Sequence, residues 1–222
     1  MQTSYYSSSI KRRSRVARIF QFAYRHKIVL ILLALGCYQF GQGTYIYAKA
    51  AVAQVLVESA WAESQESLSP VKPWSWADTW PVAKLTINGD DLYTLEGADG
   101  STLAFGPGHM PQTPMPGKVG NSVIVGHRDT HFRRLKDLES GDIIQIATHE
   151  GEFDYKIREI RIAHETQVNV LEDSPYNLLT LITCYPFDSI EPNPDYRYIV
   201  RAEQVSARDN HSSIKEKELE KI

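Results

Sequence analysis

A run without charged residues near the N-terminus, residues 28–47, constrains this chain more than any other feature. About 20 predominantly apolar residues are what an α-helix needs to cross a bilayer. The charged residues before the run are all Lys or Arg, and no Asp or Glu precedes it. The positive-inside rule therefore predicts a single membrane helix, with residues 1–27 in the cytoplasm and the chain after residue 48 exported.

Three other interpretations of this run are a cleaved signal peptide, a lipoprotein signal and a buried helix. Ala48-Lys49-Ala50 resembles a signal-peptide cleavage site, although the basic region before the run is long and the site comes late. A lipoprotein signal would use Cys37, but Leu35 stands where that pattern favours a small residue. A buried helix of a soluble protein would not explain the one-sided charge. A membrane anchor is the preferred interpretation, and cleavage stays open.

The composition narrows the function classes. A net charge of −3 and a pI near 6.2 argue against nucleic-acid binding, which usually requires a basic face. The sequence has no C-x-x-C pair and no close His/Cys cluster, so it predicts no zinc site. Cys37 and Cys184, the two cysteines, lie in such different contexts that a disulfide between them is not expected. A reducing and an oxidising compartment are both compatible with this pattern.

Most of the chain from residue 82 onward consists of short β-type runs. Residues 82–87 and 92–95 flank the turn Asn88-Gly89, and residues 143–148 and 153–162 flank a second hairpin turn. Further strands are expected at residues 122–126, 178–183 and 197–203, and a short helix at 130–138. Many short strands without repeating strand–helix units predict a closed or nearly closed β-barrel.

These signals divide the chain into five parts. A basic segment (1–27) and the membrane helix (28–47) precede a helical extension with a Trp/Pro linker (48–81). The β-domain covers residues 82–205, and a charged tail, expected to be a frayed helix or disordered, covers 206–222. The linker carries Trp74, Trp76 and Trp80, which are expected to pack on the domain or near the membrane surface.

Three residues could carry chemistry together. Cys184 ends the apolar run 178–183, and thiol chemistry also needs a base or cation and a donor for the oxyanion. Arg197 opens the strand after the next loop, so it is expected beside Cys184. His127 ends another strand, and only closure of a barrel would bring it close. A lone buried cysteine is more often a space-filling residue, so a structural role for Cys184 stays open.

Four blocks of this sequence resemble the sortases, which are membrane-bound cysteine transpeptidases. Thr180-Leu-Ile-Thr-Cys184 is similar to the family's T-L-x-T-C signature, and residues 103–117 fit its G-P-G-H…P-G segment. Residues 121–129 and 197–202 resemble its histidine and arginine strands. The resemblance covers about residues 82–205 and implies a mainly β fold, a closed barrel of about eight strands with short helices. The Trp/Pro segment 73–81 resembles a Gram-negative, often marine, proteobacterial subgroup whose members serve one dedicated substrate.

The resemblance implies roles for individual residues. Cys184 would be the nucleophile, His127 the general acid/base, and Arg197 the group that holds the substrate backbone and the oxyanion. Their neighbours Gly126, Thr183 and Tyr185 are expected to contact the substrate. Two competitors were considered less suitable: Arg201, which lies four residues on along the same strand face, and His109, which lies in a Gly/Pro-rich loop where a side chain is poorly fixed. His131 is expected at the surface.

The implied reaction is cleavage of a C-terminal sorting signal similar to L-P-x-T-G, through a thioester on Cys184, and transfer to an amine. The implied partners are an exported protein, an unidentified amine acceptor and the inner membrane, with the catalytic domain in the periplasm. No metal or organic cofactor is needed. Other possibilities are an L,D-transpeptidase, which usually has Gly where Thr183 stands, a cysteine peptidase that mainly hydrolyses, and a β-barrel binding or scaffold module with an idle cysteine.

Overall fold

The computed structural model describes residues 24–192 and 194–205. They fall into two units that meet between Ala51 and Val52. Most of the predicted cytoplasmic segment 1–27 and all of the predicted tail 206–222 lie outside the described residues. The domain boundaries inferred from composition remain predictions.

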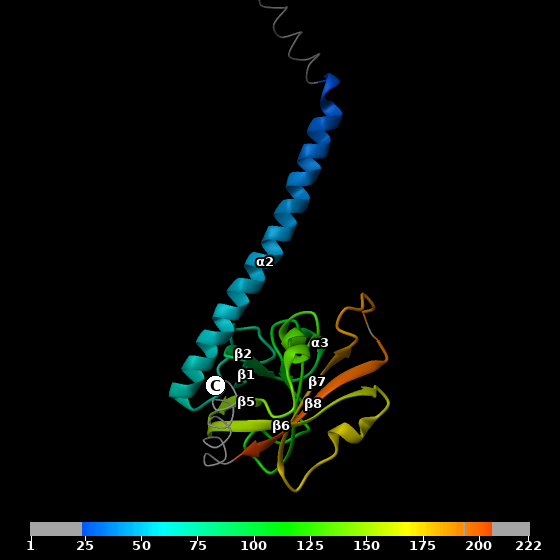
Figure 1. The fold of residues 1–222 in the computed structure, drawn as a ribbon. Coiled ribbons are helices and arrows are strands. Elements are labelled where there is room, and N and C mark those ends of the chain that lie inside the picture. The colour runs from blue at the N-terminus through cyan, green and yellow to red at the C-terminus, as the bar shows by residue number, and fades with distance from the viewer. Residues whose placement is uncertain (1–23, 193, 206–222) are drawn as a thin grey trace, which may run out of the picture. The chain divides into compact units, whose positions relative to one another are not determined.

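One long helix, α2 (Lys27–Ser67), begins at the predicted membrane segment and continues well beyond it (Figure 1). It is apolar enough and long enough to cross a membrane. From Val52 onward the helix belongs to the same unit as the β-domain. There it buries one stripe of side chains with helical spacing, and the Gln54 amide donates a 2.7 Å hydrogen bond to the carbonyl of Phe105. The buried stripe consists of Ala53, Val57, Ala60, Trp61 and Ser64.

Eight strands form a closed barrel, as expected from the sequence, in the order β1-β2-β3-β4-β7-β8-β6-β5. Neighbouring strands are antiparallel except for two parallel pairs, β2–β3 and β4–β7. The strands are β1 (Pro81–Ile87), β2 (Asp90–Glu96), β3 (Gly108–His109), β4 (Gly120–Val125), β5 (Ile143–Thr148), β6 (Gly151–His164), β7 (Asn177–Tyr185) and β8 (Tyr196–Val205).

Local sequence explains the hairpins and short helices. Asn88 and Gly89 both have positive φ, at 53° and 85°, which is the backbone that a two-residue turn with the twist of its strands requires. The short helices are α3 (Gly100–Leu103) and the 3₁₀ helices η1 (His131–Asp137) and η2 (Val168–Leu171). The helix expected at 130–138 is therefore present as η1. The side chain of Asp99 caps α3 by accepting from the amides of Ser101 and Thr102.

Alternation along the strands produces two apolar clusters. The main core includes Leu179 and Leu181 of β7, together with Ile124 of β4 and Val200 of β8. A second cluster forms from the residues between them, which point to the other face of the sheet, and η2 contributes Val170 to it. The members of this second cluster are Val123, Ala163, Val170, Ile182 and Ile199, with Met110 and Val125 packed against them. The outer face of β4, β7 and β8 is thus apolar at Val123, Val125, Ile182 and Ile199, next to the end of the barrel that carries Cys184.

Part of the Trp/Pro linker packs on the barrel, which is one of the two places expected for its tryptophans. Trp74 packs edge-on against Phe105, with ring centroids 4.9 Å apart. Thr79 donates a 2.6 Å hydrogen bond to the carbonyl of Glu96, and the amide of Glu96 donates to the carbonyl of Trp80. Trp76 does not pack on the domain, because 80% of its surface is exposed, and a place near the membrane surface stays a prediction for it.

Candidate active site

One row of paired residues crosses β4, β7 and β8 on the outer face. Val125 pairs with Ile182 in the parallel ladder, and Ile182 pairs with Ile199 in the antiparallel one. All three belong to or pack against the outer apolar cluster. Since side chains alternate with period two, residues two positions further toward this end of the barrel share the same face.

Beyond this row lie the three residues singled out from the sequence: Cys184 and Arg197 on the same face, and His127 just after the end of β4. Cys184 is two residues past Ile182 and pairs directly with Arg197, which is two residues before Ile199. His127 is two residues past Val125, and the amide of Gly126 still donates to the carbonyl of Ile182 at 3.1 Å. Cys184 is half-buried and His127 is exposed. The barrel therefore brings the three positions to the same end of the neighbouring strands β4, β7 and β8.

A hydrogen bond between the neighbouring chain segments of β4 and β7 holds the two strands together just before His127 and Cys184. The hydroxyl of Thr183, only 2% exposed, donates to the carbonyl of Gly126 at 2.7 Å. A Cβ at Gly126 would lie 2.8 Å from the ring of Phe132, so glycine permits the close approach of η1. Both residues are thus engaged within the barrel, and their contact with a substrate remains a prediction.

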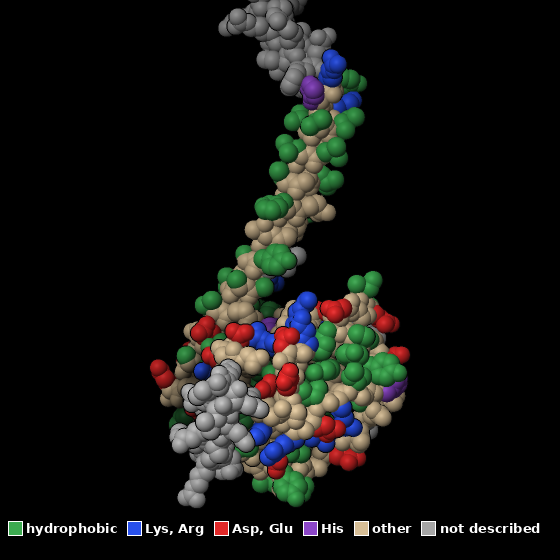
Figure 2. All heavy atoms as spheres, viewed as in Figure 1, with side chains coloured by type: hydrophobic (Ala, Val, Ile, Leu, Met, Phe, Trp, Pro, Cys, Tyr) green, Lys and Arg blue, Asp and Glu red, His purple; other side chains and the backbone are tan. Residues whose placement is uncertain are grey.

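Tyr185, the third predicted substrate contact, belongs to an aromatic group at the same end. Its ring stacks on Tyr198 at 6.2 Å and meets Phe187 edge-on, and Phe187 packs on Tyr198 at 5.0 Å. Burial raises the pKa of Tyr198, and the nearby Tyr185 and Asp137 raise it further. Figure 2 shows hydrophobic side chains gathered on the surface over the ends of β7 and β8. This end of the barrel offers apolar as well as polar contacts.

The guanidinium of Arg197 already has partners. Its Nη2 lies 2.8 Å from Oε2 of Glu165 in the β6–β7 loop, and its Nη1 donates to the carbonyls of Pro194 and Tyr196. Arg201 is placed differently: it pairs with Thr180 and Glu159, and its Nη2 lies 3.5 Å from the carbonyl of Val170. Four residues of strand separate the two arginines by about 13 Å. Only Arg197 lies opposite the cysteine.

Two other histidines named from the sequence are more buried than expected. His109 was expected to be poorly fixed, which is wrong: it lies in β3, is almost fully buried, and its Nε2 lies 3.2 Å from the carbonyl of Pro114. His131 was expected at the surface, but it is half-buried at the start of η1. Burial lowers the pKa of His131, and the charges of His127 and Arg134 lower it further.

Sequence reasoning assigned no role to two loop anchors and to the partner of Arg197. Asn121, 1% exposed, donates to the carbonyls of Val170 and Glu172 in the β6–β7 loop and accepts a hydrogen bond from Thr180 at 2.6 Å. Arg128, next to His127, donates to carbonyls of the β7–β8 loop. Asn121 and Arg128 could have been noticed in the sequence, because each is a polar residue within or beside an apolar strand. Nothing in the sequence around Glu165 indicated its role. Among residues 24–192 and 194–205, no group of three or more His, Cys, Asp or Glu could hold a metal ion.

The fold and the site define this chain as a closed eight-stranded β-barrel protein. Its half-buried cysteine lies opposite an arginine at the end of a strand. The model of the Sortase domain matches residues 85–205, which is more than half of this chain. The chain belongs to the sortase family.

Curated relatives and solved structures agree with this membership. Sortase D of Bacillus subtilis (strain 168) is 36% identical over 118 residues, covering 52% of this chain and 59% of that protein. Sortase SrtE1 of Streptomyces coelicolor is 36% identical over 110 residues, covering 44% of this chain and 30% of that protein. The matched part of this chain thus spans less than two thirds of either relative. The structure of a Clostridium perfringens Sortase D5 transpeptidase superposes with a TM-score of 0.57 at 26% identity, covering 70% of this chain and 99% of that one.

Proposed function

We propose that this chain is a cysteine transpeptidase that cleaves a C-terminal sorting signal of an exported protein and transfers the product to an amine. The observation that carries the proposal is the pairing of Cys184 with Arg197 on one face, with His127 just after the end of the neighbouring strand β4, in a member of the sortase family. The three groups supply a nucleophile, a cationic donor and an acid/base, which acyl transfer requires together.

In the first half of the proposed reaction, the thiolate of Cys184 attacks a peptide carbonyl of the sorting signal and forms a carbon–sulfur bond. The oxygen becomes negatively charged in the tetrahedral intermediate, and the guanidinium of Arg197 stabilises it. The carbon–nitrogen bond then breaks, and protonated His127 gives its proton to the departing amine. A thioester remains on Cys184, and the C-terminal part of the signal leaves.

In the second half, an amine attacks the thioester and His127 takes the proton that the amine loses. The carbon–sulfur bond breaks, a new amide forms, and the thiolate of Cys184 and protonated His127 are regenerated. Water in place of the amine would give hydrolysis. The partition between the two depends on which nucleophile reaches the thioester first.

The substrate we propose is an exported protein with a signal similar to L-P-x-T-G, served as a single dedicated target. The proposed location is the inner membrane, with the N-terminus in the cytoplasm and the barrel in the periplasm. The apolar helix α2 and the basic residues before it support this orientation. An enzyme anchored in that way would meet the C-terminal signal of a protein exported through the same membrane.

The test uses the detergent-solubilised full chain with a set of peptides bearing candidate signals. Mass spectrometry is expected to find an acyl adduct on Cys184 that hydroxylamine releases, and amine addition is expected to convert it to a new amide. Cys184→Ala is the control and should form no adduct. A scaffold with an idle cysteine predicts no adduct with any peptide, and an alkylation rate of Cys184 that is unchanged in His127→Ala.

A further inference from the structure

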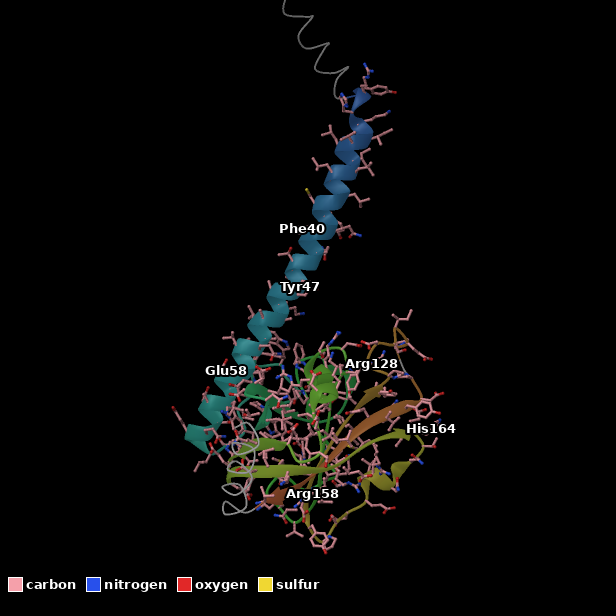
Figure 3. The ribbon with its side chains drawn as sticks, in the orientation of Figure 1. Phe40, Tyr47, Glu58, Arg128, Arg158 and His164 are labelled. Atoms are coloured by element: carbon pink, nitrogen blue, oxygen red, sulfur yellow. The ribbon has the colours of Figure 1, made fainter. Side chains whose placement is uncertain are left out.

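The residue after His127 is a buried cation. Arg128 is 5% exposed, and Figure 3 shows it at the end of the barrel where β7 passes into the loop toward β8. A charged side chain is rarely buried unless it is paired and hydrogen-bonded, because leaving water is costly. The partners of Arg128 therefore indicate what its burial stabilises.

The loop between β7 and β8 provides three of those partners. Nη1 of Arg128 donates to the carbonyl of Pro186 at 2.9 Å, and Nη2 donates to the carbonyls of Ser189, at 2.6 Å, and Glu191. Its Nε lies 3.3 Å from Oδ1 of Asp129, which supplies the opposite charge. Arginine suits this task because its planar group directs several N–H donors at fixed angles, whereas lysine has one nitrogen.

The same loop connects the cysteine strand to the arginine strand. Its far end is held by Arg197, which donates to the carbonyl of Pro194, and by the amide of Glu165, which donates to the carbonyl of Asp195 at 2.7 Å. Its near end, directly after Cys184 and Tyr185, is held by Arg128. The carbonyls of Ser189 and Glu191 both accept from Nη2 of Arg128. The side chain of Ile190, which lies between them in sequence, points fully into solvent. The backbone of this stretch thus faces the guanidinium.

We propose that Arg128 is a positioning residue that fastens the β7–β8 loop to the strand end carrying His127, and so holds the imidazole in register with the thiol of Cys184. The inference rests on the proposed function for its catalytic consequence. Arg128 has no direct contact with the reacting atoms: its effect passes through the backbone on either side, His127 before it and the loop after Cys184. A misplacement of about 1 Å between reacting groups lowers rates by about 100-fold.

The test compares Arg128→Lys and Arg128→Met with Arg133→Lys, a control at an exposed arginine of η1. Thermolysin, which cleaves before exposed isoleucine, is expected to cut the Ser189–Ile190 bond at least tenfold faster in both Arg128 variants than in the full-length wild-type chain. The kcat for thioester formation is expected to fall by about 10- to 100-fold, with KM changed less than threefold. The pH profile for alkylation of Cys184 is expected to shift in both variants and to stay unchanged in the control.

Lysine separates positioning from charge. If only the buried charge matters, Arg128→Lys restores wild-type kinetics and loop protection, and that result overturns the proposal. Wild-type chain that is cut at Ser189–Ile190 as fast as an unstructured peptide overturns it as well, even if the variants do not fold. If wild-type chain forms no thioester with any peptide, the proposed function fails, whereas loop cleavage and the alkylation profile still decide whether Arg128 positions the loop.

Discussion

Cys184 and Arg197 are directly paired on the antiparallel strands β7 and β8, so their side chains leave the barrel wall on the same face. The guanidinium forms an ion pair with Glu165 and hydrogen bonds with backbone carbonyls of its own loop. Main-chain pairing thus fixes Cys184 and Arg197 opposite each other, and loop contacts hold the guanidinium.

The choice between the two arginines can be tested directly. Arg197→Lys is expected to lower the rate of thioester formation by about 100- to 1,000-fold, the loss usual for one oxyanion donor. Arg201→Lys is expected to change it less than fivefold, since Arg201 lies opposite Thr180 and not opposite Cys184. Rapid-quench measurement of the adduct checks this. Equal losses in the two variants would contradict the assignment of Arg197.

Removing the charge of Glu165 should free the arginine. Glu165→Gln keeps an acceptor near Arg197 but ends the 2.8 Å ion pair, and partly exposed pairs of this kind contribute about 0.2–1 kcal/mol. Thioester formation is therefore expected to rise by up to about fivefold, because the guanidinium interacts more strongly with the oxyanion. Glu172→Gln in the same loop is the control. A decrease in Glu165→Gln would instead show that the carboxylate is needed to orient Arg197.

Asn121 should be important for stability as well as for the β6–β7 loop. Asn121→Ala removes the donor to the carbonyls of Val170 and Glu172 and the acceptor for Thr180, leaving buried polar groups unpaired. The free energy of unfolding is expected to fall by about 2–3 kcal/mol. Urea denaturation followed by fluorescence measures it. The exposed Gln112→Ala is the control and should change stability by less than about 0.5 kcal/mol.

The hydroxyl of Thr183 can be removed with little change of shape. Thr183→Val leaves the carbonyl of Gly126 without its donor, so we expect a loss of about 1–3 kcal/mol in unfolding free energy. Thr183→Ser keeps the hydroxyl and is expected to retain most of that stability. Denaturation midpoints of the two variants decide the question. If the valine variant is as stable as wild-type chain, the bond to Gly126 does not fasten β4 to β7.

His131 should make the barrel sensitive to mild acid. Burial first, then the charges of His127 and Arg134, hold its pKa below the usual 6.5, so the folded chain favours the neutral imidazole. As the pH falls through 6.5, the unfolded chain binds a proton that the folded chain resists, and stability decreases. The loss should continue down to the folded pKa.

The variant His131→Gln is expected to reduce this decrease between pH 7.5 and pH 5, as measured by urea midpoints. Lys136→Gln, an exposed position on the same short helix, serves as the control and should keep the wild-type dependence. A wild-type slope in His131→Gln would mean that another group causes the acid sensitivity.

Local pattern in the sequence was enough for the family and for most of the strands, but not for β3, which was expected to be part of a Gly/Pro-rich loop. Alternation, the turn Asn88-Gly89 and the apolar run after residue 27 depend only on neighbours in the chain, and each appears in the structure as a strand, hairpin or helix. Cys184 and Arg197 are joined by a single loop, so their proximity could also be expected. The motif around Cys184 resembled the family that the domain match establishes.

The tertiary structure alone decided what depends on contacts between distant residues. The parallel pairing of β4 with β7 places Val125, two residues before His127, beside Ile182, two residues before Cys184, although His127 and Cys184 are 57 positions apart in sequence. The pairing of Glu165 with Arg197 and the hold of Arg128 on the loop after Cys184 likewise join separate segments. Propensity and spacing act over a few residues, whereas strand register and buried charge are settled only when the barrel closes.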